Sequence, residues 1–143
     1  MAFSHGKNTV VQVDNAAGTL TAITAYTNES SWPQEIDATE TTVFGQGSKT
    51  YIVGLADSKF SCGGLLDPTL DTLMTGVRAG LIAGTVTGGT STIEYAPAGT
   101  ATGNPKYTAE GILTSYEVSA SVGDADEWKA EYQITGAVTR TTY

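Results

Sequence analysis

The chain has 143 residues, which suits one domain with a core of ordinary size and requires no disulfide or metal to hold it together. Fifteen acidic residues against seven basic ones give a formal net charge of -8, which argues against a nucleic-acid-binding surface of clustered lysine and arginine. Charged residues make up only 15% of the chain. No run of residues resembles a secretory signal or a membrane span, so we expect assembly in the cytoplasm and no membrane partner.

The first 50 residues predict few core elements. A short strand is expected at residues 9–13, whereas residues 20–28 suit either a helical turn or a strand. Residues 34–49 are poor in apolar side chains, contain several acids and are broken by Gly45 and Gly47. This composition is typical of a projecting loop or loose hairpin. Residues 1–8 are expected to form an N-terminal arm.

One helix is predicted in the middle of the chain, after strands expected at residues 51–55 and 59–66. Asp67 suits the N-cap, and Pro68 suits the first helical position, where a missing N–H costs nothing. The apolar residues that follow recur at the spacing of an amphipathic helix, namely Leu70, Leu73, Met74 and Val77. We expect this helix to end near Gly80 and to lie flat on a sheet.

The last third of the chain alternates between apolar and polar residues like a two-stranded ribbon. Further strands are candidates at residues 81–87, 91–96 and 107–113, and residues 116–138 predict a hairpin that turns at 123–127. One side of this hairpin should be buried. That side carries Tyr116, Val118, Ala120 and Val122 on the first strand and Trp128, Ala130, Tyr132, Ile134 and Val138 on the second.

No group of residues predicts an enzyme, a cofactor site or a metal site. The tract 45–50 lacks the second glycine and the following helix of a phosphate-binding loop, so a plain turn is the better interpretation. His5 and Cys62 are the only residues of their kinds, which disfavours a catalytic triad or a Cys/His pair. The acids of the 123–127 turn are too few for a calcium loop. We therefore predict a protein that is not an enzyme.

Several short tracts occur in a characteristic order. They are Trp32-Pro33, Phe44-Gly45, Tyr51 to Leu55, Asp67-Pro68-Thr69, Tyr95 to Gly99, Tyr116 to Asp124 with Trp128, and Gly136 to Thr139. In this order the chain resembles the major tail tube proteins of long-tailed, non-contractile bacteriophages, over about residues 10–140. The resemblance implies a mainly β fold in a single domain over residues 1–143, a β-sandwich or rolled barrel of antiparallel strands with one flanking α-helix.

The resemblance also implies a structural virion protein that assembles into stacked rings, usually hexameric, through which the genome is ejected into the host. Its implied partners are further copies of itself, tail tip and tail terminator proteins at the tube ends, and the tape measure protein and DNA transiently in the lumen, without sequence-specific binding. In this family an extended loop contacts neighbouring subunits. By position, the resemblance assigns oligomer contacts to Gln34, Glu35, Asp37, Glu40, Phe44, Gln46 and Lys49.

Two other interpretations stay open at this stage. One is a related tube or connector component of another phage-like machine. The other is a monomeric β-sandwich that binds glycans, with Trp32, Tyr95, Tyr107 and Trp128 as stacking platforms. The sequence assigns no residue to the lumen, because the polar side of the last hairpin can line the tube or form its outer surface.

Overall fold

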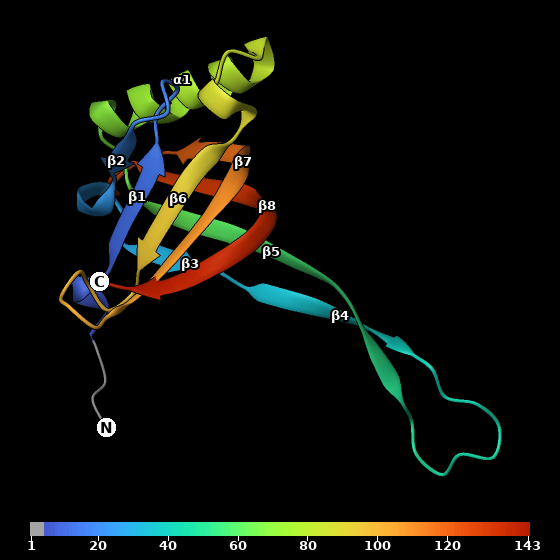
Figure 1. The fold of residues 1–143 in the computed structure, drawn as a ribbon. Helices are drawn as coiled ribbons and strands as arrows, with labels where there is room; N and C mark the ends of the chain where they lie inside the picture. Colours follow the sequence, from blue (N-terminus) through green and yellow to red (C-terminus); the bar gives the residue numbers. More distant parts are fainter. Residues whose placement is uncertain (1–4) are drawn as a thin grey trace.

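The computed structural model describes residues 5–143, and their strands form one antiparallel sheet of eight strands (Figure 1). The strands are β1 (Val10–Asp14), β2 (Leu20–Ala22), β3 (Glu29–Ser31), β4 (Gln34–Glu40), β5 (Tyr51–Leu65), β6 (Ser91–Ala96), β7 (Pro105–Ser119) and β8 (Glu127–Thr142). Their order in the main sheet is β2-β1-β6-β7-β8-β5-β3, and β4 pairs with β5 outside this path. The mainly β fold with one helix is confirmed.

The sheet is rolled because β7 and β8 are long, bent strands that belong to both of its halves. β6 pairs with β7 only as far as Gly111, and β5 pairs with β8 only as far as Gln133. The register between β7 and β8 shifts after Thr108 and after Leu113, and such irregularities bend a strand. As a result, β1 and β6 lie across the interior from β5 and β3 (Figure 1).

Both halves of the rolled sheet contribute side chains to one core. The buried core residues of the strands include Val11, Val13, Phe60, Cys62, Ile93, Trp128, Ala130, Tyr132 and Ile134. The buried alternation predicted for residues 128–134 is therefore confirmed. Trp128 is only 1% exposed, and its indole Nε1 donates a hydrogen bond to the carbonyl oxygen of Tyr26 at 2.9 Å. This bond satisfies the one polar atom of a large buried side chain.

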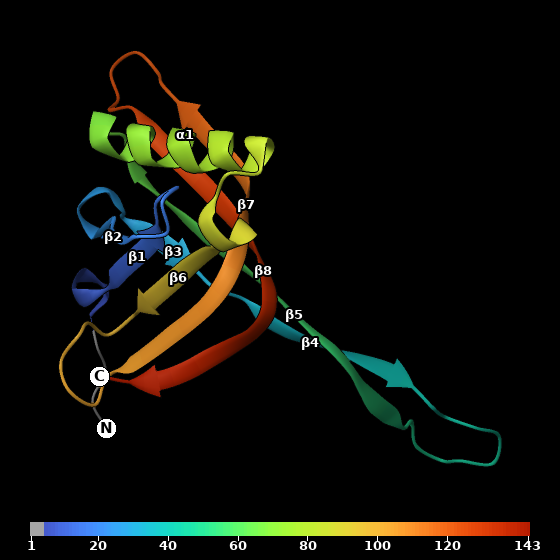
Figure 2. The ribbon, with the colours of Figure 1, turned by 45° about the horizontal axis from the view of Figure 1, so that its top comes forward.

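The helix α1 (Pro68–Ala83) lies across one end of the rolled sheet (Figure 2). The Asp67 carboxylate caps it by accepting a hydrogen bond from the Thr69 amide at 2.8 Å, as predicted. Leu70, Met74 and Val77 of the predicted apolar face are buried in the core. Within residues 5–143, no helix combines the length and the apolar character that a bilayer crossing needs.

The predicted end of the helix at Gly80 is wrong. The helix continues to Ala83 and ends at Gly84, whose φ of 73° is the left-handed conformation that glycine adopts at helix C-termini. Gly80 instead allows close packing, because a Cβ there would lie 2.8 Å from the Cγ2 of Val86. The candidate strand at residues 81–87 is accordingly the helix end followed by a turn.

The structure resolves one open alternative and differs from expectation in two further segments. Residues 20–28 contain both of the alternatives, the strand β2 and a 3-10 turn at Thr24–Tyr26. The strands predicted at 51–55 and 59–66 are one continuous strand, β5. In the last hairpin, Tyr116 packs against the core, but Val118, Ala120 and Val122 are exposed because this end of the hairpin extends beyond the body.

The predicted N-terminal arm is described only from His5 onward. Gly6–Asn8 form a 3-10 turn in which the Nδ1 of His5 accepts a hydrogen bond from the Lys7 amide at 3.2 Å. The hydroxyl of Thr9 donates to the carbonyl oxygen of Pro97 at 3.0 Å and so attaches the start of β1 to the loop after β6. Residues 1–4 of the predicted arm lie outside the described residues.

Candidate assembly surfaces

A two-stranded arm, residues 34–57, projects from the body of the molecule (Figure 1, cyan to green). It consists of β4 and the first half of β5, paired from Gln34 opposite Ser58 to Glu40 opposite Tyr51. The segment expected as a projecting loop or loose hairpin at residues 34–49 is one strand of a hairpin plus most of its tip. At the base of the arm, the Nε2 of Gln133 on β8 donates a hydrogen bond to the Asp57 carboxylate at 2.8 Å. This bond ties the arm to the body.

The arm is irregular at one point. The register shifts between Ile36 and Ala38, where Gly54 and Leu55 of β5 together lie opposite Asp37 and form a bulge. Gly54 is part of this bulge, and a Cβ at that position would lie 2.9 Å from the Cβ of Asp37. A glycine is therefore needed for the two strands to pass each other here.

The tip of the arm, residues 41–50, is held by its own hydrogen bonds. The Thr41 amide donates to the carbonyl oxygen of Thr50 at 2.8 Å, and the Thr50 amide donates to the hydroxyl of Thr42 at 2.9 Å. The side-chain oxygen of Gln46 accepts a hydrogen bond from the Val43 amide at 2.9 Å. These bonds give the tip a defined shape without help from the body.

The arm exposes large apolar side chains on both faces. Residues that pair across the two strands share a face, so Ile36, Tyr51 and Val53 lie on one face and Ile52, which pairs with Thr39, lies on the other. Leu55 is 83% exposed. Exposed apolar patches of this kind are rare on monomers and mark surfaces that another molecule covers.

All seven residues predicted as oligomer contacts lie on the arm. Gln34, Glu35, Asp37 and Glu40 belong to β4, whereas Phe44, Gln46 and Lys49 belong to the tip. Their contact with another copy stays a prediction. The prediction missed the other strand of the arm, because the alternation of residues 51–55 is the same for an exposed hairpin as for a strand over a core.

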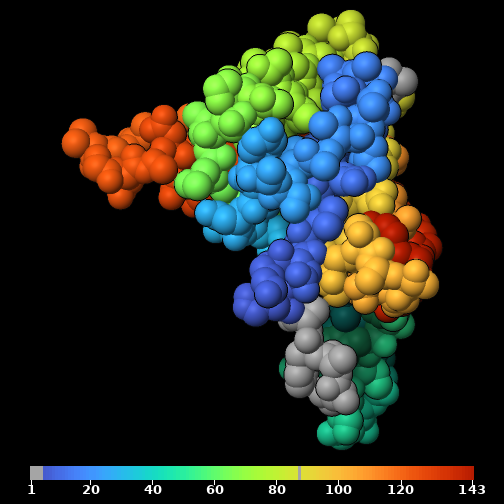
Figure 3. Space-filling view, turned by 90° about the vertical axis from the view of Figure 1, so that its left-hand side faces the viewer, coloured from blue at the N-terminus to red at the C-terminus, as the bar shows by residue number. Residues whose placement is uncertain are grey.

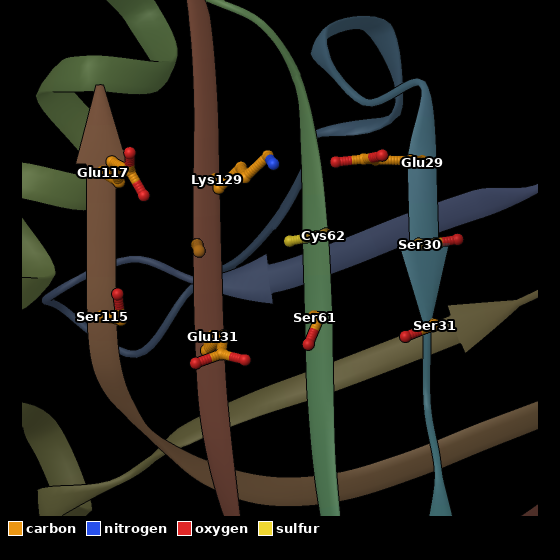
Figure 4. A pocket seen from close by; sticks show the side chains of 10 residues that line it. Glu29, Ser30, Ser31, Ser61, Cys62, Ser115, Glu117, Lys129 and Glu131 are labelled. Carbon is orange, nitrogen blue, oxygen red and sulfur yellow. The ribbon is translucent and has the colours of Figure 1, made fainter. Parts of the chain in front are cut away.

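A polar face lies on the outer side of the four neighbouring strands β7, β8, β5 and β3 (Figure 4). Its lining side chains include Glu29, Ser61, Ser115, Glu117, Lys129 and Glu131, and they surround a hollow of about 460 Å³. Three carboxylates and one ammonium group give these six residues a formal charge of -2. The opposite side of the same strands is the apolar core.

Cys62 borders the polar face but is not a reactive thiol. Its side chain is buried, and desolvation, with a smaller contribution from the Glu29 carboxylate, raises its pKa to about 12. A thiol with this pKa stays protonated near neutral pH and is a poor nucleophile. The described residues also contain no group of three or more His, Cys, Asp or Glu side chains arranged to hold a metal ion.

The aromatic residues considered as glycan platforms pack in or against the core. The ring of Trp32 lies 5.2 Å from that of Phe60 and 6.3 Å from those of Tyr95 and Tyr107, measured between centroids. Trp128 is buried outright. These side chains pack with one another and with the core instead of forming a free aromatic platform, so nothing in this cluster favours a glycan site.

Several strand edges have no partner within the described chain. β3 pairs with β5 on one side only, and residues 112–119 of β7 pair only with β8. The section β7-β8-β5-β3 that carries the polar face is therefore open at both ends. Open edges of this kind are templates for pairing with another chain.

Comparison with known proteins identifies the fold. No family model and no curated protein matches the sequence. Among solved structures, a chain from the tail of an empty gene transfer agent particle with C6 symmetry superposes with a TM-score of 0.75 and 14% identity, covering 98% of this chain and 100% of that one. The SPP1 tail tube gives a TM-score of 0.71 at 11% identity, covering 99% and 80%.

The structural similarity extends to a contractile injection system. A chain of the PVC sheath-tube complex, an extracellular contractile injection system in its extended state, has a TM-score of 0.69 and 13% identity, covering 99% of this chain and 93% of that one. At such low identities the likeness concerns the fold. The protein has the fold found in the tails and tail tubes of phages and phage-like particles.

Proposed function

We propose that this chain is the structural subunit of a tail tube, which assembles from stacked rings into the conduit for genome ejection. The observation that carries the proposal is the apolar surface of the arm. It consists of seven large side chains that the described residues leave exposed, namely Ile36, Val43, Phe44, Tyr51, Ile52, Val53 and Leu55. Full burial of one such side chain contributes about 1.5–3 kcal/mol, so a neighbouring copy that covers the arm is strongly favoured.

The open edges support the same proposal. If β3 of one copy pairs with β7 of the next, the four-stranded sections join into one sheet that closes on itself around a ring. Closure removes the unpaired edges and links assembly to backbone hydrogen bonding. Six copies, the number that we propose by analogy with the C6 tail, would complete the ring.

We assign the polar face to the lumen of this ring. The face lies on the strands whose edges are open, and its formal charge of -2 has the same sign as the DNA phosphates. Six copies carry 6 × -8, or -48, formal charges per ring. Like charges repel the duplex weakly along its whole path, so DNA slides through such a tube without being held.

The remaining partners follow from the role. The tube needs tail tip and terminator proteins to close its ends, and the tape measure protein and then DNA occupy the lumen without base-specific contacts. The protein would be located in the virion tail after assembly in the host cytoplasm. No step of this function requires a catalytic residue.

Removal of the arm tests the proposal. Glu35 and Asp57 face each other across the hairpin, so an Asn-Gly turn can replace residues 36–56 and close the shortened strands. Wild-type protein should form rings or hollow fibres in negative-stain electron microscopy, whereas the shortened variant should stay monomeric with an unchanged circular dichroism spectrum of its body. Deletion of the exposed residues 100–102, in the loop before β7, is the control and should leave assembly intact. A wild-type chain that is monomeric at every concentration would refute the proposal.

A further inference from the structure

A second projection lies on another side of the body. It is the distal hairpin, residues 118–127, which joins β7 to β8 and protrudes beside the start of α1 (Figure 3, orange). The hydroxyl of Ser121 donates to the Asp124 carboxylate at 2.9 Å, and the Leu66 amide donates to the carbonyl oxygen of Asp126 at 2.9 Å. The projection is therefore ordered by its own turn and tied to the body.

The distal hairpin exposes apolar side chains that no residue from His5 to Tyr143 covers. Val122 is fully exposed, and Val118 is 47% exposed. The tip of the arm also exposes apolar side chains, since Phe44 is fully exposed and Val43 is 65% exposed. Each projection thus ends in a small apolar patch, and each patch is too small to be a core of its own.

The two projections carry opposite charge. The distal hairpin contains Asp124, Asp126 and Glu127 and no base, whereas the tip of the arm contains Lys49 and no acid. Apolar side chains with oppositely charged neighbours are the pattern of two surfaces that fit each other. A surface of like chemistry, such as a second distal hairpin, would instead place six carboxylates together.

The arm and the distal hairpin point away from each other (Figures 2 and 3). The tip of one copy consequently cannot reach the distal hairpin of the same copy. A contact between them joins two copies head to tail and leaves one free arm and one free distal hairpin at the ends of the pair. Such a heterologous contact continues from copy to copy.

We infer that the tip of the arm of one copy docks on the distal hairpin of another, with Val43 and Phe44 against Val118 and Val122 and with Lys49 beside the acids of the 123–127 turn. The inference rests on the proposed function, because it names the receiving surface for the arm. It specifies one contact among those that a tube requires.

Cysteine cross-linking tests the contact. The variant Phe44→Cys with Val122→Cys should form a ladder of covalent multimers, three copies and larger, on mild oxidation. The buried Cys62 does not interfere, because its thiol is inaccessible. Each single variant should give no ladder, and the pair Ile82→Cys with Val122→Cys is the matched control, since Ile82 is exposed on α1 but outside the contact.

The outcomes separate this inference from the proposed function. Tubes in the electron microscope without a ladder would overturn the docking and leave the tail tube role standing. Dimers from either single variant would also overturn it, because they indicate a like-with-like contact. A chain that never assembles would overturn both.

Charge reversal gives a second, independent test. Lys49→Glu should raise the protein concentration needed for half-assembly about fivefold, as expected for loss of an exposed ion pair. Addition of Asp124→Lys and Asp126→Lys to that variant should restore assembly, whereas the two lysine substitutions alone should impair it. Failure of the combined variant to recover, with its fold intact, would contradict the contact.

Discussion

Gly64 lies where β5 passes under the chain that leads from the 3-10 turn into β3. A Cβ at this position would overlap the carbonyl oxygen of Tyr26 and would lie 2.9 Å from the Asn28 amide and the Thr27 Cα. All three neighbours are backbone atoms, which cannot rotate away as a side chain can. The glycine is therefore required for the close approach of two segments that are 36 residues apart in the sequence.

We expect Gly64→Ala to lower the free energy of unfolding by about 1–3 kcal/mol or more, as overpacking of a tight site does. Gly76→Ala is the control, because a Cβ there meets nothing within 4 Å in the middle of α1. That substitution should raise the free energy of unfolding by about 0.8–1 kcal/mol through helix propensity. Urea titration followed by circular dichroism measures both. Equal effects of the two substitutions would show that the contact at Gly64 is unimportant.

At the scale of elements, α1 is joined to the sheet by both apolar and polar contacts. Leu70, Met74 and Val77 bury the apolar side of the helix. The hydroxyl of Tyr116 on β7 donates a hydrogen bond to the Asp71 carboxylate in the first helical turn at 2.9 Å. Desolvation, the hydrogen bond and the charge of Asp71 together raise the pKa of Tyr116 to about 12.

The hydrogen bond between Tyr116 and Asp71 predicts that the free energy of unfolding depends on pH. Because the folded-state pKa of Tyr116 is raised above the ordinary tyrosine pKa of about 10, its contribution to stability is complete below pH 10 and is lost as the pH rises through about 12. The free energy of unfolding of the wild type should therefore fall over this interval. The free energy of unfolding of Tyr116→Phe should fall less steeply. Tyr51→Phe, on the exposed arm, serves as the control and should keep the wild-type profile. Urea titrations at pH 9, 10, 11 and 12 measure the difference, and parallel profiles for wild type and Tyr116→Phe would contradict the link.

Considered as a whole, the molecule separates three surfaces by chemistry. The arm is apolar on both faces, the distal hairpin is acidic around two valines, and the polar face carries three carboxylates and one ammonium group. The rolled sheet holds these surfaces on different sides of one core. A subunit with such an arrangement can contact several neighbours at once while presenting a charged wall to a lumen.

The polar face makes a testable prediction about DNA. Wild-type protein should not retard a labelled duplex in a gel at about 50 mM salt, because its net charge of -8 repels phosphate. The variant with Glu117→Lys and Glu131→Lys should retard it in a salt-dependent way, since the formal charge of the face changes from -2 to +2.

The matched control for this experiment is Glu35→Lys with Glu40→Lys, which has the same net charge of -4 but places both lysines on the arm. It should bind the duplex more weakly than the variant of the polar face. Equal retardation by the two variants would show that total charge alone determines duplex binding, and that the polar face has no special relation to DNA.

The local sequence pattern was sufficient to predict the structure where the periodicity of the apolar residues coincides with their burial. Trp128 and Tyr132 alternate with polar residues and are buried, and Asp67 with Pro68 marks the start of α1, because capping and alternation depend on neighbours in sequence. The projection of residues 34–49 from the body was likewise readable from the glycines and acids of this segment. These features were determined by the sequence itself.

Tertiary structure decided the rest. Leu55 and Phe60 belong to the same strand, yet one is 83% exposed and the other is 0% exposed, because only the second half of β5 meets the opposite half of the sheet. Val122 was expected in the core and is exposed for the same reason. Gly80 resembles a helix stop, but the helix ends at Gly84. The close packing of Val86 is the reason for a glycine at position 80. A sequence determines which faces an element has, whereas only the fold of the whole chain determines which of those faces another element covers.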